Sequence, residues 1–260
     1  FRQLPSTLDF APLLQEAKKQ LHLEADYRQE AERLSRYEAW VQGDERFLVP
    51  KVIHSLSTET VLAMSYLGGA PIETLLSYPS EIRNNIAGQL LELALRELFQ
   101  WGLVQTDPNF SNYRYDTTTN QIQLFDFGAV QSYPYKRRLA LQGLLQACLD
   151  DDPLKMAEAA EKVGYLSPED PSSYRDQVVS LLGLVCEPLR FGEYQFGRDD
   201  LVDRMSQLLI EMRLQGQHGR LPPSDILFLH RKLGGLYLLL AKLKATLPVR
   251  QMVERYALDI

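Results

Sequence analysis

The sequence predicts an α+β fold in which most of the mass is helical. Three observations predict it: apolar residues recur at helical spacing over long stretches, two short segments have the character of strands, and clusters of turn residues separate these segments. The chain has 260 residues, of which 45% are hydrophobic and 24% charged. This composition is ordinary for a folded protein, and the length is sufficient for one or two domains with a large core.

The charge balance and the cysteine content exclude several classes of protein. The chain carries 28 Lys and Arg against 34 Asp and Glu, a net charge of −6, so we expect no nucleic-acid partner. Cys148 and Cys186 are far apart in sequence and form no CxxC pattern, which predicts neither a disulfide framework nor a zinc module. No apolar run reaches the roughly 20 residues of a membrane-spanning helix, and no signal peptide is visible. Any membrane contact is therefore expected to be peripheral.

The first hundred residues are expected to form a helix, a hairpin and a second helix. Apolar residues recur every three or four positions over the first forty residues, and Gly43 ends that pattern. Residues 49–53 and 60–67 flank a polar turn and predict a hairpin that ends at a Gly-Gly pair. A long helix is then predicted from Ser80, a suitable N-cap, to Trp101.

The rest of the chain is expected to contain one more hairpin and a bundle of helices. A polar loop at 105–112 precedes a hairpin with strands at 113–115 and 121–125, where Ile122 and Leu124 alternate with polar neighbours. From Tyr135 onward the chain is predicted to be entirely helical. The breaks between helices are expected at residues 150–153, 167–171, 190–197 and 216–223.

The candidate site consists of Asp107, Asn112 and Asp126. Asp107 and Asn112 lie five apart in the polar loop, and Asp126 ends the second hairpin in an Asp-Phe-Gly sequence. In kinases one Asp orients the acceptor oxygen, an Asn five residues later holds one Mg²⁺, and the Asp of Asp-Phe-Gly holds Mg²⁺ against the phosphates. Each motif alone is more simply explained as a turn. Both motifs together, with a helix before and a hairpin between, favour kinase-like phosphoryl transfer.

One feature of ordinary protein kinases is missing from the sequence. Asp-Phe-Gly is followed almost directly by the helix predicted from Tyr135, and Ala-Pro-Glu occurs nowhere in the chain. In protein kinases the segment that ends in Ala-Pro-Glu supports the peptide substrate. Its absence argues against ordinary Ser, Thr or Tyr kinase activity.

Other charged segments allow two interpretations each. Glu24, Asp26 and Glu30 on the first helix are either a solvated face or include a partner for a phosphate-binding Lys. Periodicity favours a buried strand for the segment 60–67; the alternative is the hinge between two lobes, in which the backbone of residues 64–67 would face an adenine. The helix over 229–244 is more simply the core of a bundle than a lipid-facing surface, although Arg231, Lys232, Lys242 and Lys244 are a candidate basic patch.

Several segments resemble the UbiB family of atypical kinases, in particular its coenzyme Q branch. EADYRQEA at 24–31 resembles the ExD-containing helix of that family, and QTDPNFSN at 105–112 and LFDFGA at 124–129 resemble its catalytic and metal-binding loops. LHRKLGG at 229–235 and KLKA at 242–245 resemble its C-terminal helices. The resemblance covers nearly the whole chain and implies a protein-kinase-like fold.

The resemblance implies a role for each matching residue. Asp107 would be the catalytic-loop Asp, Asn112 and Asp126 the Mg²⁺ ligands, and Glu30 the partner of the nucleotide-binding Lys. Glu24 and Asp26 would form the ExD pair, which in this family engages an N-terminal extension. The gatekeeper and hinge that bind the nucleotide would be Met64, Ser65, Tyr66 and Leu67.

The resemblance also implies how the chain is divided. Residues 1–66 would form part of a kinase-like N-lobe, and residues 67–260 the C-lobe with a helical extension. The family's KxGQ helices, its Ala-rich nucleotide loop and its strand Lys would precede the first helix, and the chain contains none of them. We therefore expect it to be the C-terminal portion of such a protein. Gln105 stands where kinases usually have the His of His-x-Asp.

The activity that the resemblance implies is ATP- and Mg²⁺-dependent and supports ubiquinone or related prenyl-quinone biosynthesis. The expected partners are the nucleotide, prenyl-quinone intermediates or the enzymes that make them, and a membrane lipid surface. The expected location is the bacterial cytoplasm at the membrane periphery, or else the matrix face of the mitochondrial inner membrane or a plastid. Two alternatives remain: a non-catalytic scaffold that binds lipid or protein, and a small-molecule phosphotransferase, which would share the Asp-x4-Asn loop but lack the ExD helix.

Overall fold

The computed structural model describes residues 26–198, 200–214 and 222–258, and the predictions for residues 1–25, Glu24 included, lie outside this part. Helix α2 (Tyr27–Val41) confirms the first predicted helix over the described residues. Asp26 is its N-cap, because the Asp26 carboxylate accepts the backbone N–H of Arg28 at 3.1 Å.

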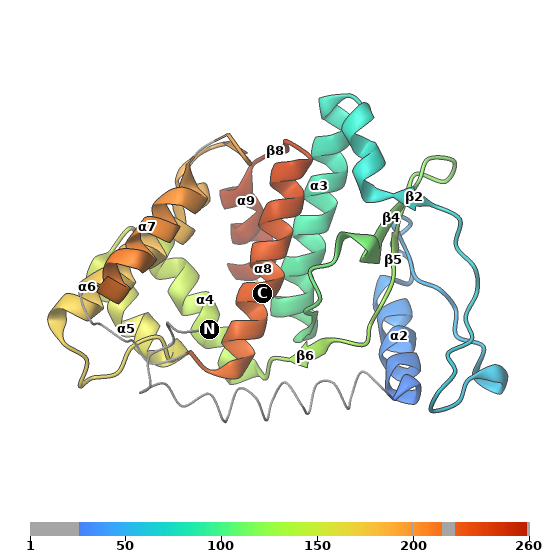
Figure 1. The fold of residues 1–260 in the computed structure, drawn as a ribbon, viewed down its shortest axis with the longest axis horizontal. Helices are drawn as coiled ribbons and strands as arrows, with labels where there is room; N and C mark the ends of the chain where they lie inside the picture. The colour runs from blue at the N-terminus through green and yellow to red at the C-terminus, as the bar shows by residue number, and fades with distance from the viewer. Residues whose placement is uncertain (1–25, 199, 215–221, 259–260) are drawn as a thin grey trace.

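Two long helices, α3 (Ser80–Leu95) and α8 (Ser224–Lys242), run through the middle of the molecule. Figure 1 shows the sheet and α2 on one side of this pair and the helices α4 to α7 on the other. The bounds of the other helices are α4 (Tyr135–Leu149), α5 (Pro153–Val163), α6 (Ser172–Val185), α7 (Leu201–Leu214) and α9 (Val249–Val253). The predicted breaks at 150–153, 167–171 and 190–197 fall close to the observed ones, and most of the break predicted at 216–223 lies outside the described residues. The mixed and mainly helical fold class is confirmed.

The main sheet has four short strands in the order β1-β5-β4-β2. Its centre is the predicted second hairpin, in which β4 and β5 pair antiparallel with Tyr113 opposite Leu124, and this prediction is confirmed. A separate antiparallel pair joins β3 and β6, which flank the candidate site in sequence. The strand bounds are β1 (Phe47–Leu48), β2 (Ala70–Pro71), β3 (Leu103–Gln105), β4 (Tyr113–Asp116), β5 (Gln121–Leu124) and β6 (Val130–Ser132).

Two secondary-structure predictions are wrong. The first predicted hairpin is reduced to one isolated antiparallel bridge between Val52 and Met64, and residues 60–67 form no regular strand. This segment stays largely exposed, with Val61 52% accessible, so its apolar residues have no sheet partner to bury them. The chain after Tyr135 is also not all helical, because β7 (Tyr194–Gln195) pairs with β8 (Thr246–Leu247).

The core is continuous between the sheet side and the helical side. α8 contributes Leu229, Leu236, Leu239 and Leu240 to it, which confirms that this helix is mainly core. The two cysteines are distant in sequence, and both are buried and free. Among the described helices, none is both long and apolar enough to cross a membrane.

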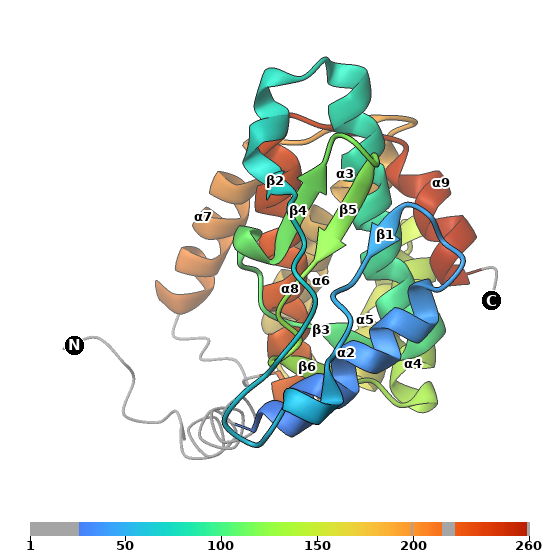
Figure 2. The same ribbon diagram turned by 90° about the vertical axis from the view of Figure 1, so that its right-hand side faces the viewer.

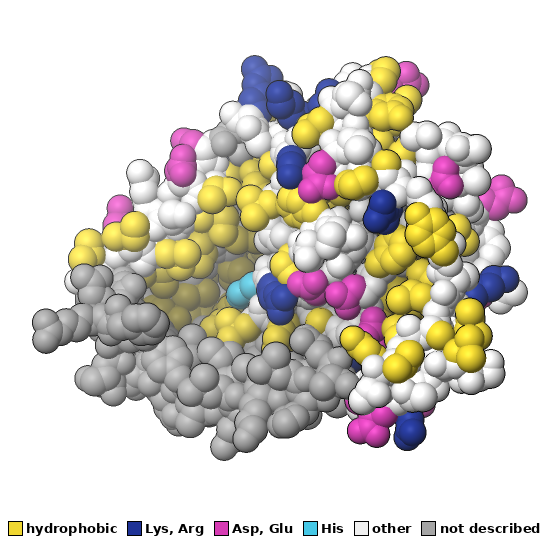
Figure 3. Space-filling model, turned by 45° about the vertical axis from the view of Figure 1, so that its right-hand side comes forward, with side chains coloured by type: hydrophobic (Ala, Val, Ile, Leu, Met, Phe, Trp, Pro, Cys, Tyr) yellow, Lys and Arg dark blue, Asp and Glu magenta, His cyan; other side chains and the backbone are white. Residues whose placement is uncertain are grey.

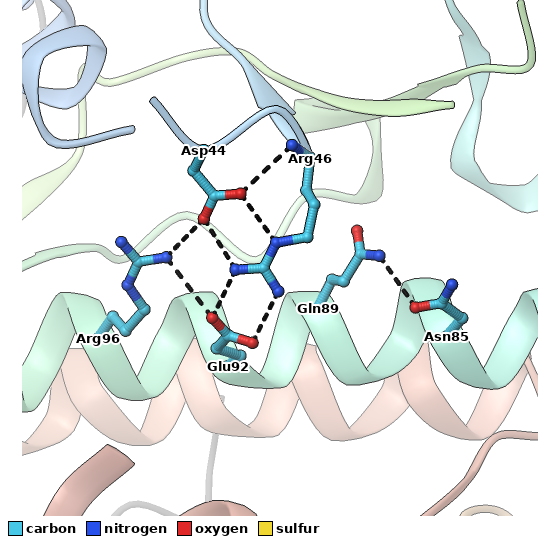
Figure 4. Close-up of polar contacts among 6 residues, drawn as sticks. All are labelled: Asp44, Arg46, Asn85, Gln89, Glu92 and Arg96. Atoms are coloured by element: carbon cyan, nitrogen blue, oxygen red, sulfur yellow. Dashed lines mark hydrogen bonds and ion pairs between the residues drawn. The ribbon is translucent and has the colours of Figure 1, made fainter. Parts of the chain in front are cut away.

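An ion-pair network joins the turn after α2 to α3, as Figure 4 shows. Arg46 donates to Asp44 at 2.8 Å and to Glu92 at 2.7 and 2.9 Å. Arg96, one turn after Glu92 on the same helix, donates to Asp44 at 2.9 Å. These guanidinium groups hold the pKa of Asp44 down at about 2. The network thus fixes the position of α2 and β1 relative to the long helix.

Candidate functional site

The loop that carries Asp107 begins where α3 ends. A π-helical turn (Arg96–Trp101) finishes α3, and Gly102 follows in the left-handed conformation with φ +68°. A Cβ at Gly102 would lie only 2.9 Å from the carbonyl oxygen of Tyr133, so glycine is required both by φ and by space. The Thr106 N–H donates to the carbonyl of Ala129 at 2.8 Å, which continues the β3–β6 pairing into the loop. This pairing brings the loop beside residues 126–129.

Both carboxylate oxygens of Asp107 have a partner. Asn112 donates its side-chain N–H to one oxygen at 2.9 Å, and Arg231 of α8 donates to the other at 2.8 Å. Asn112 is buried and ends a short 3₁₀ turn (Phe110–Asn112), which Asn109 caps through the N–H of Ser111. The five-residue spacing of Asp107 and Asn112 therefore reflects a compact turn that closes on itself.

Asp126 lies next to this turn. The N–H of Phe125 donates to the carbonyl of Asn112 at 2.9 Å, so the end of β5 is held against the loop. The carboxylate of Asp126 is exposed and accepts the N–H of Gly128 at 3.1 Å. Its backbone has φ +58°, a conformation that non-glycine residues seldom adopt. Asp107, Asn112 and Asp126 are thus brought together by local pairing.

The oxygens of Asn112 and Asp126 suit Mg²⁺ chemically. Mg²⁺ prefers carboxylate and carbonyl oxygens, and it usually uses only one or two protein carboxylates, with waters and substrate phosphates completing its coordination. The described residues contain no group of three or more His, Cys, Asp or Glu side chains that could hold a metal by themselves. This donor set therefore fits a metal that arrives with a phosphate ligand.

Helix α2 contacts the segment between β5 and β6, and in Figure 2 the helix lies in front, close to the β6 label. Arg33 donates to the carbonyl groups of Phe127 and Gly128, and the ring of Tyr37 lies 4.3 Å from that of Phe127. Glu30 is buried on the same face of α2, because it lies three and seven residues before these two contacts. Asp26 is one turn further away at the helix cap, where it also accepts from Gln29 at 3.1 Å.

The four predicted hinge residues are not brought to the three site residues by any hydrogen bond or ion pair in the described chain. The N–H of Ser65 donates to the backbone carbonyl of Lys51 at 2.8 Å, and the N–H of Lys51 donates to the hydroxyl of Ser65 at 2.9 Å. Tyr66 is 90% exposed, and Met64 is also exposed. Leu67 is partly buried and leads through two glycines to β2.

Lys232 is buried beneath the loop that carries Asp107, whereas the sequence predicts it in an exposed basic patch. Its side chain is 4% exposed, and its Nζ lies 3.1 Å from a carboxylate oxygen of Glu97, a residue of the turn that ends α3. Burial alone would lower the pKa of Lys232, but the charge of Glu97 and the hydroxyl of Tyr113 outweigh it and raise that pKa. The helical period offered a signal, because Lys232 falls on the same stripe as Leu229 and Leu236.

The predicted basic patch is therefore wrong for Lys232, which is buried. Arg231 is paired with Asp107, and Lys242 lies 3.5 Å from Glu73. Figure 3 shows acidic and basic side chains in contact near the centre of one face, beside a hollow lined by hydrophobic side chains.

A cavity of about 530 Å³ opens beside the loop at residues 105–112, on the side where this loop meets α8 and β2. Its wall is largely apolar, with Arg114 and Glu73 as the charged members. The lining residues are Pro71, Glu73, Pro108, Asn109, Phe110, Ser111, Arg114, Gly235 and Leu238. A molecule in this cavity would contact Pro108, the residue that follows Asp107.

Comparison with known proteins relates this arrangement to a family. The model of the ABC1 atypical kinase-like domain matches residues 1–160. The mitochondrial atypical kinase COQ8B of Rattus norvegicus is 32% identical over 255 residues, covering 96% of this chain and 47% of its own length. The mitochondrial atypical kinase coq-8 of Caenorhabditis elegans is 34% identical over 238 residues, covering 88% of this chain and 31% of its own length. The chain thus spans less than half the length of these relatives.

A solved structure shows the same fold. The protein Rv3197 of Mycobacterium tuberculosis, determined in complex with erythromycin, matches with a TM-score of 0.77 at 21% identity, over 98% of this chain and 63% of its own. At this identity the likeness concerns the fold alone. Together with the match over residues 1–160, it confirms the predicted kinase-like fold and the predicted family resemblance. The chain belongs to the ABC1 atypical kinase-like family, which includes the COQ8 proteins and is also called UbiB.

Proposed function

We propose that this chain carries the catalytic and Mg²⁺-binding residues of an ATP-dependent atypical kinase or ATPase. The observation that carries the proposal is the hydrogen-bonded turn that joins Asp107 to Asn112 and the pairing that holds Asp126 beside it. Phosphoryl transfer depends mainly on positioning and on charge stabilisation, and this arrangement provides oxygen ligands next to a carboxylate.

Each of the three residues has a distinct role in this proposal. Asp107 orients the attacking oxygen and accepts its proton, since its carboxylate reaches the surface of the loop between Asn112 and Arg231. Asn112 and Asp126 hold Mg²⁺ through their side-chain oxygens. When bound, the ion neutralises charge on the transferring phosphoryl group.

Glu30 is the further residue proposed for nucleotide binding. It is buried on the face of α2 that contacts the Asp126–Gly128 segment, which supports a role at the phosphates rather than on a solvated face. In the proposal it pairs with a phosphate-binding Lys of the whole protein. The ExD residues Glu24 and Asp26 contact an N-terminal extension, and the backbone of residues 64–67 receives the adenine.

The relatives suggest the biological setting. Their names describe mitochondrial atypical kinases. We infer that the protein supports prenyl-quinone biosynthesis at a membrane surface, with residues 1–66 in one lobe and 67–260 in the other. The proposed partners are the nucleotide, prenyl-quinone intermediates or the enzymes that make them, and lipid; the compartment is the bacterial cytoplasm, with mitochondria and plastids as alternatives.

The test is Mg²⁺-dependent ATP turnover by the full-length protein. Asp126→Asn and Asp107→Asn are each expected to reduce turnover at least about 100-fold, because each removes a charge that acts on the transferring group. Asp116→Asn, at the end of β4 in the same hairpin, is the matched control and should retain wild-type turnover. Unchanged turnover in Asp126→Asn would contradict the proposal.

A non-catalytic scaffold is the second candidate, and the engagement of both Asp107 oxygens favours it. In that case wild-type protein binds Mg²⁺-ATP without hydrolysing it. Co-sedimentation with anionic liposomes would also survive Asp126→Asn. Turnover that disappears in Asp126→Asn excludes this candidate.

A further inference from the structure

A chain of buried polar groups reaches the backbone of Asp126 from α8. Lys232 donates to the side-chain oxygen of Gln105 at 3.3 Å, and Gln105 donates its side-chain N–H to the carbonyl of Asp126 at 3.2 Å. Gln105 and Lys232 are both almost completely buried. The last link of this chain is therefore the main chain of the proposed metal ligand.

Chemistry fixes the direction of the Gln105 amide. A Lys ammonium group can only donate hydrogen bonds, so the Gln105 oxygen must face Lys232. A backbone carbonyl can only accept, so the Gln105 nitrogen must face Asp126. Flipping the amide would leave both bonds unmade inside the protein, which is costly for buried groups.

The ammonium group behind Gln105 is itself held in place. Glu97 lies 3.1 Å from Lys232 Nζ, and the hydroxyl of Tyr113 accepts from it at 3.0 Å. With the pKa of Lys232 raised, the group remains protonated at neutral pH. A fixed positive charge against the amide oxygen polarises the amide and strengthens the N–H that Gln105 presents to Asp126.

Asp126 needs such a constraint. Its φ of +58° is uncommon for a residue with a side chain, although Asp adopts it more readily than most, and hydrogen bonds from the surroundings stabilise it. In the described structure Asp126 accepts two hydrogen bonds. The side chain of Gln105 donates to its backbone carbonyl, and the N–H of Gly128 donates to its carboxylate. The first bond holds the backbone conformation of Asp126, and the second holds the orientation of its side chain.

We propose that Gln105, oriented by the buried Lys232, is a positioning residue that fixes the backbone of Asp126 and thereby aims its carboxylate at Mg²⁺. The proposal rests on the function proposed above and adds two residues to it. Gln105 stands where kinases usually have the His before the catalytic Asp. In this proposal its side chain links α8, through Lys232, to the backbone of the metal ligand Asp126.

The test compares Gln105→Met with Gln142→Met in the full-length protein. Gln142 on α4 also donates its side-chain N–H to a backbone carbonyl, that of Ala257 at 2.6 Å, but it lies in the helical half. Both variants lose one amide-to-carbonyl bond, and only one of these bonds ends at Asp126. Gln105→Met is expected to raise the Mg²⁺ concentration for half-maximal ATP turnover about three- to tenfold, the effect of one hydrogen bond. Gln142→Met should leave this concentration unchanged.

A second measurement does not depend on activity. In Gln105→Met the backbone amides of Phe127 and Gly128 should exchange hydrogen about three- to tenfold faster than in Gln142→Met, because the turn at Asp126 opens more often. Equal exchange in both variants overturns the inference. Equal Mg²⁺ dependence of turnover in both variants also overturns it, provided that Asp126→Asn abolishes turnover in the same protein. A wild-type protein without Mg²⁺-dependent nucleotide binding instead overturns the proposed function, and the exchange data then decide on the backbone contact alone.

Discussion

Gly235 shows at the level of a single residue how closely α8 approaches the loop that carries Asp107. A Cβ at this position would overlap the Cβ of Pro108, the residue that follows Asp107. The proline ring is rigid, so it cannot move aside as a flexible side chain would. Absence of a side chain at Gly235 is therefore a condition for the contact between helix and loop.

Two neighbouring glycines provide a matched pair of substitutions. Gly235→Ala is expected to destabilise the protein by about 1–3 kcal/mol, because the helix or the loop must shift. Gly234→Ala has nothing within 4 Å of the added Cβ and should stabilise the helix by up to about 1 kcal/mol. Denaturation by urea measures both. Equal stability changes in the two variants would contradict the close packing at Pro108.

At the residue scale, the sequence predicts some positions well and others poorly. It selected Asp107, Asn112 and Asp126, since they lie within a short stretch whose local pairing brings them together. It misplaced Lys232 because a Lys among leucines was assigned to the surface on its charge alone. The compensating carboxylate of Glu97 is far away in sequence, and no local pattern links the two.

At the scale of elements, the contact between the turn after α2 and α3 depends on charge. Asp44 and Glu92 each have a lowered pKa: for Asp44 hydrogen bonds from Arg46 are the main cause, and for Glu92 the bonds and charges of Arg46, Tyr256 and Arg96 outweigh the opposing effect of burial. The pKa of Asp44 is about 2 in the folded protein, against an ordinary value of 3.8. The folded state therefore binds a proton at Asp44 less readily than the unfolded state does.

This difference predicts acid sensitivity. The stabilisation from Asp44 is fully present above its ordinary pKa of 3.8 and is lost as the pH falls to about 2. Solvent screening limits it to about 2 kcal/mol at most. Asp44→Asn should be less stable at pH 7 and should lose less stability than wild type between pH 4 and pH 2, as followed by urea denaturation at each pH. Parallel losses in the two proteins would refute this role of Asp44.

The elements themselves are largely predictable where the signal in the sequence is local. The hairpin of β4 and β5 and the breaks between helices follow from turn residues and periodicity. The failed hairpin at residues 49–67 had strand-like residues but no neighbouring strand to cover them, and β7 with β8 pairs segments separated by two helices. Strand formation depends on such partners, which a local pattern does not contain.

At the scale of the whole molecule, the ion pair of Lys232 and Glu97 joins the C-terminal half to the end of α3. Lys232→Met is expected to destabilise the protein by about 3–5 kcal/mol, because it leaves Glu97 buried without its counter-charge. The double variant Lys232→Met, Glu97→Leu should recover most of this loss, since hydrophobic residues can replace a buried ion pair. Thermal unfolding of the three proteins measures both effects. A double variant less stable than Lys232→Met would contradict this account.

The position of α8 has a consequence for exchanging parts between related proteins. The matched family domain ends at residue 160, yet Arg231, Lys232 and Gly235 of α8 contact the loop around Asp107. A chimera with its crossover near residue 160 would combine one protein's loop with another protein's supporting helix. Transplanting the loop and α8 together is the design that preserves these contacts.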